Sequence, residues 1–194
     1  MNFRPLLLVV PLLLTGCSTM SHMSWSSLSP LNWFGSSVEV SDMGVAGINA
    51  STPLNEAAIN KALDDDYRLR SGMGTRNGTV TSFYQALDGD TLVMTISGDD
   101  KGTVKRVNVE SDAIKTAWGV KIGTPFSDLY EKAYGVCQKG QGDNANDVEC
   151  VAKESRHVSY LFSGEWHGPE GLMPSDDTLK NWKITQIVWH ANAI

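Results

Sequence analysis

The sequence predicts an α+β fold built on a mostly antiparallel sheet, with two or three short helices. The main observation is a run of four strand-like segments between residues 67 and 109, separated by Asn77-Gly78, Asp88-Gly89 and the polar turn 98–102. Asn-Gly and Asp-Gly tolerate positive φ angles, so they are strong hairpin signals. The second observation is that helix-start signals are few and lie outside this run. At 41% hydrophobic residues, the composition is that of an ordinary globular protein.

The first 16 residues are predicted to be a secretory signal peptide that is removed. Arg4 supplies a positive charge, and the apolar stretch 6–14, which contains Pro11, is shorter than the roughly 20 apolar residues of a spanning helix. The segment Leu14-Thr15-Gly16-Cys17 resembles the lipobox of bacterial lipoproteins, in which the cysteine is lipidated and becomes the new N-terminus. We therefore expect lipid on Cys17. The alternative is a secreted protein in which Cys17 is an unpaired thiol.

A lipid anchor predicts where the protein resides. A diacylglyceryl group with a further amide-linked chain exceeds the two signals that stable membrane attachment requires. Ser18 and Thr19 follow the cysteine, and neither is the aspartate typical of inner-membrane retention. By this analogy we expect the periplasmic leaflet of the outer membrane. Residues 17–37 are rich in serine and are predicted to be a tether, followed by a single domain at 38–194.

Two helices are predicted from similar start signals. Thr52-Pro53 fits an N-cap followed by proline at the first helical position, and an apolar stripe continues over 54–63. Thr124-Pro125 repeats the pattern, with a stripe over 126–133 and Gly135 as a stop signal. The preceding segments, GVAGINASTP and GVKIGTP, are also alike. This is compatible with two related halves, 38–110 and 111–194, and two unrelated helices with the same start chemistry are at least as good an explanation.

The strands of the predicted sheet follow from alternation and from turn positions. Before the second helix we expect strands over 67–73, 79–87, 91–97 and 103–109, the third of which alternates apolar and polar residues. After it we expect strands near Cys137, near Cys150, over 157–163 and over 183–190. Asp64, Asp65 and Asp66 then belong to a solvated helix end, because a hard-cation loop needs spaced ligands.

Cys137 and Cys150 remain once Cys17 is assigned to lipid. Two cysteines in an exported domain favour one structural disulfide, closing the polar segment QKGQGDNANDVE between them. Two free thiols or a redox pair are the alternatives. No paired-ligand spacing near these cysteines indicates zinc. We expect no metal and no cofactor.

The segment 164–177 holds the weak candidate surface site. Glu165, Trp166, His167 and Glu170 combine possible metal ligands with an aromatic ring. A loop with several glycines and prolines is more often a conformational device than a site. Asp176 follows Ser175 in what is predicted to be a third helix start.

Two long stretches and the lipobox carry a family resemblance. GVKIGTPFSDLYEKAYGVC and SGEWHGPEGLMPSDDTLKNWKITQIVW resemble the sigma-E-regulated (RpoE-regulated) lipoprotein family of enteric bacteria. The resemblance implies an envelope lipoprotein whose expression rises under outer-membrane stress. It implies no catalytic mechanism, because the family's domain is of unknown function.

The function classes follow from charge and motifs. A net charge of −6, which loses one positive charge with the signal peptide, argues against nucleic acid as a partner. No nucleophile elbow, zinc-protease motif or P-loop is present. We expect no enzyme but a module that binds an envelope protein, peptide or lipid-like ligand through a sheet face or edge. Exposed apolar or aromatic surface around Trp118, Trp166, Trp182 and Trp189 would favour this function. The alternative is an envelope hydrolase using the 164–177 loop, with Glu165, His167 or Asp176 converging in a pocket.

Overall fold

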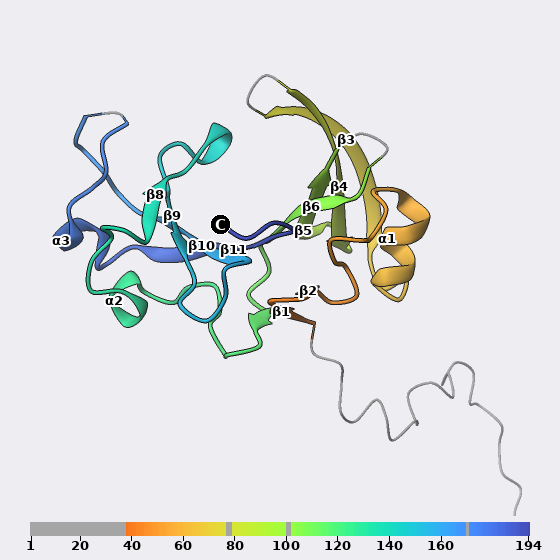
Figure 1. Ribbon diagram of the computed structural model, residues 1–194, viewed down its shortest axis with the longest axis horizontal. Helices are drawn as coiled ribbons and strands as arrows, with labels where there is room; N and C mark the ends of the chain where they lie inside the picture. Colours follow the sequence, from red (N-terminus) through yellow and green to blue (C-terminus); the bar gives the residue numbers. More distant parts are fainter. Residues whose placement is uncertain (1–37, 77–78, 100–101, 170) are drawn as a thin grey trace, which may run out of the picture. The chain divides into compact units, whose positions relative to one another are not determined.

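The computed structural model describes residues 38–76, 79–99, 102–169 and 171–194, and it confirms the α+β class (Figure 1). Residues 37–194 form one compact unit. The predicted signal peptide, Cys17, the tether, the Asn77-Gly78 turn and Glu170 lie outside the described residues. In the described ranges, no helix combines the length and apolar character that a bilayer crossing needs.

An eight-stranded antiparallel sheet organises the domain. Its strands occur in the order β3-β4-β5-β6-β11-β10-β9-β8. The eight predicted strands are therefore confirmed. Their bounds are β3 (Arg68–Arg76), β4 (Thr79–Asp88), β5 (Thr91–Gly98), β6 (Val104–Val109), β8 (Cys137–Lys139), β9 (Val148–Val151), β10 (Val158–Ser163) and β11 (Lys183–His190). A small second sheet has the order β2-β1-β7, from β1 (Glu39–Ser41), β2 (Gly44–Val45) and β7 (Lys115–Thr116).

The large sheet consists of two four-stranded meanders joined at β6 and β11. The register of β5 on β6 runs from Met94↔Val109, shifts after Ser97 and ends at Gly98↔Val104. The register of β10 on β11 runs from Val158↔Trp189, shifts after Leu161 and ends at Ser163↔Lys183. A strand irregularity thus lies at the same step in both meanders. The pairings of β5 with β6 and of β10 with β11 thus have the same pattern, so positions near these strands have equivalents in the two meanders.

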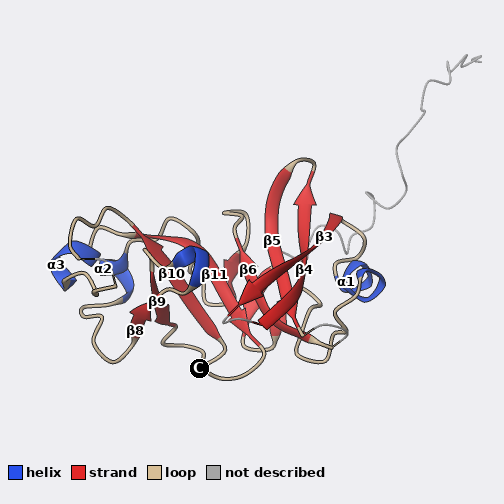
Figure 2. Cartoon of the chain, turned by 90° about the horizontal axis from the view of Figure 1, so that it is seen from above, coloured by secondary structure: helices blue, strands red, loops and turns tan. Residues whose placement is uncertain are grey.

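The helices lie at the two ends of the sheet. Figure 2 shows α1 (Glu56–Ala62) beside β3 and β4, and α2 (Phe126–Leu129) and α3 (Asp176–Leu179) beside the β8–β10 end. Short η3 (Gly142–Asn144) lies in the loop between β8 and β9. Ser175 caps α3 by accepting a hydrogen bond from the Thr178 amide, which confirms the third predicted helix start.

The predicted start of the first helix is wrong by one turn. Asn55, not Thr52, is the N-cap of α1, and its side chain accepts a hydrogen bond from the Ala58 amide at 2.9 Å. Thr52 and Leu54 instead use their backbone groups to pair with the strand entry at Gly102 and Val104. These two hydrogen bonds satisfy the backbone groups of Thr52 and Leu54, so the helix begins after Leu54. The aspartates at 64–66 are exposed after α1, as expected, and Asp64 and Asp65 have positive φ.

The second helix is shorter than predicted. It ends at Leu129, because Tyr130 adopts an extended conformation with φ −135°. This places the Tyr130 hydroxyl 2.7 Å from the Val151 carbonyl oxygen, to which it donates, and the ring against Phe126 and Phe162. The apolar stripe over 126–133 therefore continues into the core as extended chain.

The core takes up two of the four tryptophans around which exposed aromatic surface would favour a binding function. Trp182 and Trp189 are 3% and 2% exposed, so neither contributes such a surface. Trp118 is half-buried and donates from Nε1 to the Tyr160 hydroxyl at 2.6 Å, and Trp166 is also half-buried. Cys137 and Cys150 are directly paired across β8 and β9 and form the expected disulfide.

Candidate functional site

The two faces of the large sheet differ in chemistry. Met94, Ile96, Val107 and Val109 point into the core, and the alternate residues of the same strands form the opposite face. On that opposite face β5 and β6 carry hydroxyl, amide and charged side chains. We call it the polar face, and it is defined by Phe83, Gln85, Thr95, Ser97, Arg106, Asn108, Glu110, Glu149, Ser159, Gln186 and His190.

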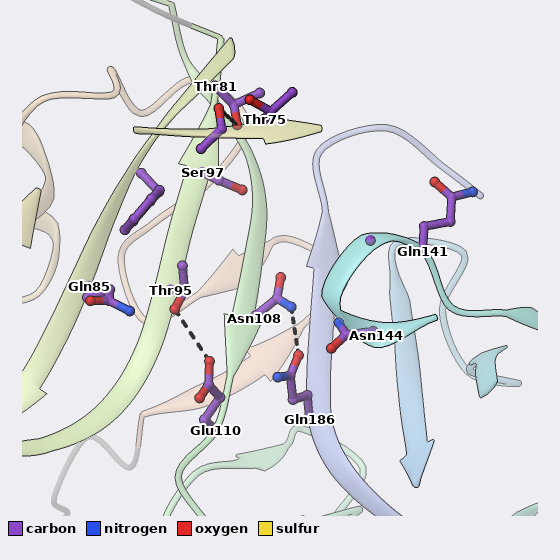
Figure 3. Close-up of a pocket in the computed structure, with 13 residues that line it drawn as sticks. Thr75, Thr81, Gln85, Thr95, Ser97, Asn108, Glu110, Gln141, Asn144 and Gln186 are labelled. Atoms are coloured by element: carbon purple, nitrogen blue, oxygen red, sulfur yellow. Dashed lines mark hydrogen bonds between the residues drawn. The ribbon is translucent and has the colours of Figure 1, made fainter. Parts of the chain in front are cut away.

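A cavity of about 390 Å³ lies on the polar face, and we call it the first cavity (Figure 3). Its floor comes from β4, β5, β6 and β11, and one wall from the loop that carries η3. Hydroxyl groups, side-chain amides, one carboxylate and one aromatic ring line it. The side chains are Thr75, Thr81, Phe83, Gln85, Thr95, Ser97, Asn108, Glu110, Gln141, Asn144 and Gln186. The volume is within the usual range for small-ligand sites.

Glu110 provides the carboxylate of the first cavity. Thr95 Oγ1 donates to Glu110 Oε1 at 3.4 Å, and Figure 3 shows the two side chains pointing toward each other. Burial raises the pKa of Glu110 above its usual value, and the hydrogen bond from Thr95 offsets part of this rise. Among the described residues, no basic side chain forms an ion pair with this carboxylate. The group therefore has acceptor capacity that faces the cavity.

Phe83 provides the aromatic ring of the first cavity, and two glycines of β3 make room for it. Phe83 pairs with Gly72 across the strands, and a Cβ atom added to Gly72 would lie 2.4 Å from Phe83 Cζ. A Cβ atom at Gly74 would lie 3.7 Å from the same ring, which is ordinary contact. The ring thus covers Gly72 on the polar face and is half-buried.

Amide groups are fixed across the junction of the two meanders. Asn108 Nδ2 on β6 donates to Gln186 Oε1 on β11 at 2.7 Å, and Arg106 Nε donates to Asn108 Oδ1 at 3.0 Å. On the far side of the first cavity, Gln85 Oε1 accepts from Arg70 Nε and Nη2 at 3.0 and 2.6 Å. These bonds fix the orientation of Gln85, Asn108 and Gln186. The Nε2 groups of Gln85 and Gln186, and the second N–H and second lone pair of the Asn108 amide, are left as hydrogen-bonding capacity for a ligand.

A charged cluster lies on the same face at β9, β10 and β11. Glu149 Oε1 lies 3.2 Å from Arg106 Nη2, 3.2 Å from His190 Nε2 and 2.6 Å from Ser159 Oγ. Burial alone would raise the pKa of Glu149. The hydrogen bonds from His190 and Ser159 and the charge of Arg106 outweigh burial and lower this pKa to about 2. The cluster is thus a satisfied buried ion pair network.

This cluster does not have the geometry of a serine-histidine-carboxylate triad. Ser159 Oγ lies 2.9 Å from His190 Nε2, but the carboxylate of Glu149 contacts the same ring nitrogen rather than the other one. The single Ser159 proton is donated to Glu149, and the Ser159 side chain is fully buried. Ser159 is therefore not positioned to act as a nucleophile.

The charged cluster borders a second cavity of about 230 Å³, lined by Arg106, Gln138, Gln141, Asn144, Glu149, His190 and Ile194. Gln141 and Asn144 of the η3 loop line both cavities. The polar face is therefore hollowed at two adjacent places that share one wall.

The two cavities occupy equivalent positions in the two meanders. Phe83 on β4 pairs with Ser97, and Glu149 on β9 pairs with Leu161. Ser97 and Leu161 are each the last residue before the register shift of their strand, β5 or β10. Thr95 and Ser159 each lie two residues earlier on the same strands. The backbone amide of Glu110 donates to the Val93 carbonyl oxygen, and that of His190 donates to the His157 carbonyl oxygen. Val93 and His157 are equivalent, because each directly precedes the first residue of β5 or β10 that pairs with β6 or β11. Thr95, Glu110 and Phe83 thus correspond to Ser159, His190 and Glu149.

The candidates of the 164–177 loop are placed differently. Glu165 and His167 are 93% and 90% exposed, with 3.9 Å between Glu165 Oε2 and His167 Nε2. Trp166 Nε1 donates to the Pro169 carbonyl oxygen at 3.3 Å, and Glu170 lies outside the described residues. Asp176 Oδ1 accepts from the Ala133 amide at 2.8 Å. These side chains line neither of the two cavities. His157 is half-buried, with Nδ1 2.9 Å from the His190 carbonyl oxygen.

Sequence reasoning missed the polar face. Its signal was present in the alternation of Arg106 and Asn108 with Val107 and Val109 on the strand predicted over 103–109, which Glu110 directly follows. What could not be read was that this strand pairs with β11, which brings Gln186 next to Asn108.

Comparisons with known proteins give a family and a fold. The family described as "Protein of unknown function (DUF1131)" matches residues 22–191. The chain is 59% identical to "Uncharacterized protein YfeY" of Escherichia coli (strain K12) over 188 residues, which cover 97% of this chain and 98% of that protein. It is also similar to the crystal structure of the uncharacterised protein YfeY from Escherichia coli, with 57% identity and a TM-score of 0.71. That match covers 78% of this chain and 99% of the crystallised one.

Proposed function

Because the chain belongs to the DUF1131 family of proteins of unknown function, membership brings no activity, and we propose one from the site itself. The protein is a lipoprotein of the cell envelope, held at the periplasmic leaflet of the outer membrane by lipid on Cys17. Its domain binds a ligand on the polar face without catalysing a reaction on it. The link to outer-membrane stress that the family resemblance implies is part of this proposal.

One observation carries the binding role. The first cavity presents a half-buried carboxylate, Glu110, with no ion pair among the described residues, beside amides that are held in fixed orientations. Removing a carboxylate from water costs free energy, so an arrangement that leaves it facing a cavity is favourable when a ligand donates hydrogen bonds to it. The equivalent position in the other meander, His190, is already bonded to its neighbours.

The hydrolase alternative has less support in the arrangement of side chains. Glu165 and His167 are almost fully exposed, and the Asp176 carboxylate is engaged by a backbone amide. A general acid and base pair acts on a bound substrate in a defined pocket. The 164–177 loop lines neither described cavity.

The test has two arms in whole cells that express the full chain. Cys17→Ala is expected to move the protein from the membrane fraction to the soluble periplasmic fraction. In a chain that keeps Cys17, a photoreactive residue placed at Thr81, on the first cavity, is expected to form a covalent adduct on irradiation. The same residue at exposed Glu131 is the control and should form none. Retention of the Cys17→Ala protein in the membrane would refute the anchor, and equal labelling at both positions would refute the binding face.

A further inference from the structure

The lining of the first cavity is chemically balanced between hydrogen-bond donors and acceptors. Side-chain amides and hydroxyls each offer both, and they make up most of the lining around Glu110 and Phe83. A ligand that complements them must also present donors and acceptors side by side. Hydroxyl and amide groups have this property, whereas a phosphate or a simple ammonium group has only one of the two.

The charges around the first cavity also indicate a neutral ligand. Glu110 is the one carboxylate of its described lining. Arg70 is held at one edge through Gln85, and Arg106, at the other edge, forms an ion pair with Glu149 at 3.2 Å. Among the described residues, the charge of Glu149 is thus compensated by Arg106, and the single carboxylate Glu110 is left in the first cavity with Arg70 at the opposite edge. A strongly anionic or cationic ligand would meet unfavourable charge on one side of the cavity.

Phe83 adds an apolar surface to this polar site. Its ring is half-buried and lines the cavity, and Gly72 leaves space behind it. A flat aromatic face among amides, hydroxyls and a carboxylate suits a ligand that has one apolar face and a polar rim. A pyranose ring is such a ligand, since its C–H groups form a face and its hydroxyl groups lie at the periphery.

The neighbouring second cavity indicates the length of the ligand. Gln141 and Asn144 line both cavities, so the hollowed surface runs from Phe83 on β4 across β6 and β11 to Glu149 on β9. A chain of several rings fits two adjacent cavities better than a single ring does. The loop with Gln141 and Asn144 is anchored at its ends by the Cys137–Cys150 disulfide, which reduces the entropy lost when that wall is ordered on binding.

We propose that the polar face binds a neutral oligosaccharide, with one sugar ring against Phe83 and its hydroxyl groups hydrogen-bonded to Glu110, Asn108 and Gln186. This inference rests on the proposed binding function and specifies its ligand. The carboxylate of Glu110 accepts from sugar hydroxyls, and the amides of Asn108 and Gln186 both donate and accept. The charged cluster at Glu149 fixes the far wall and does not itself need a ligand.

The experiment is a glycan array probed with the full chain, purified in a detergent without a sugar head group. The array carries neutral oligosaccharides, among them N-acetylated and hydroxyl-only tetramers, together with cationic glucosamine tetramers and oligosaccharide fragments of purified cell wall. We expect at least one neutral oligosaccharide to bind. Binding to the cell-wall fragments as well would indicate a glycan of the cell-wall scaffold as the ligand, and binding to the neutral tetramers alone would indicate a soluble sugar.

Two matched pairs of variants locate the binding. Glu110→Gln and Phe83→Leu should each weaken the affinity for the bound oligosaccharide at least tenfold, measured by titration calorimetry. Glu131→Gln and Tyr134→Leu change exposed residues of the same types and should leave the affinity unchanged. Far-ultraviolet circular dichroism checks that all four variants are folded.

Three results would overturn the oligosaccharide proposal. These are no neutral glycan bound above the blank, binding restricted to the cationic tetramers, or binding unaffected by both Glu110→Gln and Phe83→Leu. If the photoreactive residue at Thr81 still forms its adduct in cells, the binding function stands and another ligand class is required. If that adduct is absent as well, both proposals fail.

Discussion

Glu149 is a buried carboxylate that remains charged because its neighbours compensate for burial. Its pKa is lowered to about 2, and it contacts Arg106, Ser159 and His190 within 3.2 Å. A pKa that is lower in the folded chain than in the unfolded chain stabilises the fold at pH values above the unfolded pKa. The stabilisation is present above about pH 4.5 and is lost as the pH falls toward 2.

Glu149→Gln is therefore expected to destabilise the domain by about 3 kcal/mol at pH 7, since it removes the buried negative charge that Arg106 and His190 contact. The measurement is urea unfolding at pH 7, 5 and 3. The unaltered protein should lose stability between pH 5 and 3, and the variant should lose less over the same interval. Glu131→Gln, at an exposed position, is the control and should follow the unaltered protein. Parallel curves for both variants would contradict the role assigned to the cluster.

The residues of the polar face show what alternation can and cannot predict. Thr95 and Ser97 alternate with Met94 and Ile96, so their common face was predictable. The ion pair between Arg106 and Glu149 was not, because it joins strands of different meanders. A single sequence contains no signal for that contact.

At the scale of elements, β3 and β4 depend on the absence of a side chain. Gly72 lies under the Phe83 ring, and Gly74 lies at its margin. Glycine in a strand costs conformational entropy, so its presence at position 72 is explained by the close approach of the ring.

Gly72→Ala and Gly74→Ala form a matched pair. Gly72→Ala forces the ring or the strand to move and is expected to lower the free energy of unfolding by about 1–3 kcal/mol. Gly74→Ala meets only ordinary contacts and is expected to be neutral or slightly stabilising, because it reduces the freedom of the unfolded chain. Thermal unfolding of both variants measures the difference. Equal effects at the two positions would show that the ring does not depend on Gly72.

The helices show why local signals fix the existence of an element better than its ends. The segments Thr52-Pro53 and Thr124-Pro125 were interpreted as helix starts, and a helix follows each of them. The backbone at both sites first pairs with a distant strand, at Thr103 and at Lys183, so the helices begin later. Long-range hydrogen bonds overrode the local cap signal, and nothing near either proline indicates them.

For the whole molecule, the junction of β6 and β11 decides how the domain unfolds. The two meanders are joined by four residue pairs between these strands, and buried residues from both form one core cluster. A break at the junction would expose apolar residues on both sides. We therefore expect both meanders to unfold in one cooperative transition.

Ile96→Ala tests this cooperativity. Ile96 is fully buried in the first meander, and the described tryptophans, Trp118, Trp166, Trp182 and Trp189, follow it in the second part of the chain. The substitution should destabilise the domain by about 2–5 kcal/mol. Tryptophan fluorescence, measured in a background in which Trp25 and Trp33 are replaced by phenylalanine so that it reports the four described tryptophans, should shift its urea midpoint together with far-ultraviolet circular dichroism. An unchanged fluorescence midpoint would mean that the meanders unfold separately.

The overall architecture was only partly predictable. Composition and turn spacing gave the α+β class and the meander order within each part, since hairpins join neighbours in the chain. The order of the meanders in one sheet depends on the β6–β11 pairing, which no turn specifies.

The eight-stranded sheet ends in two terminal strands, β3 and β8, and the outer edge of a terminal strand can pair with another molecule in solution. In the described part of the chain, β3 is a terminal strand of nine residues, and its outer backbone groups resemble those that join strands of neighbouring molecules. Arg68 and Arg70 place positive charge along this margin, where two molecules approaching edge to edge would bring like charges together. Arg68 also pairs with Asp90 at 3.2 Å, so the repulsion expected between two such borders comes mainly from Arg70 and is independent of the well-packed interior.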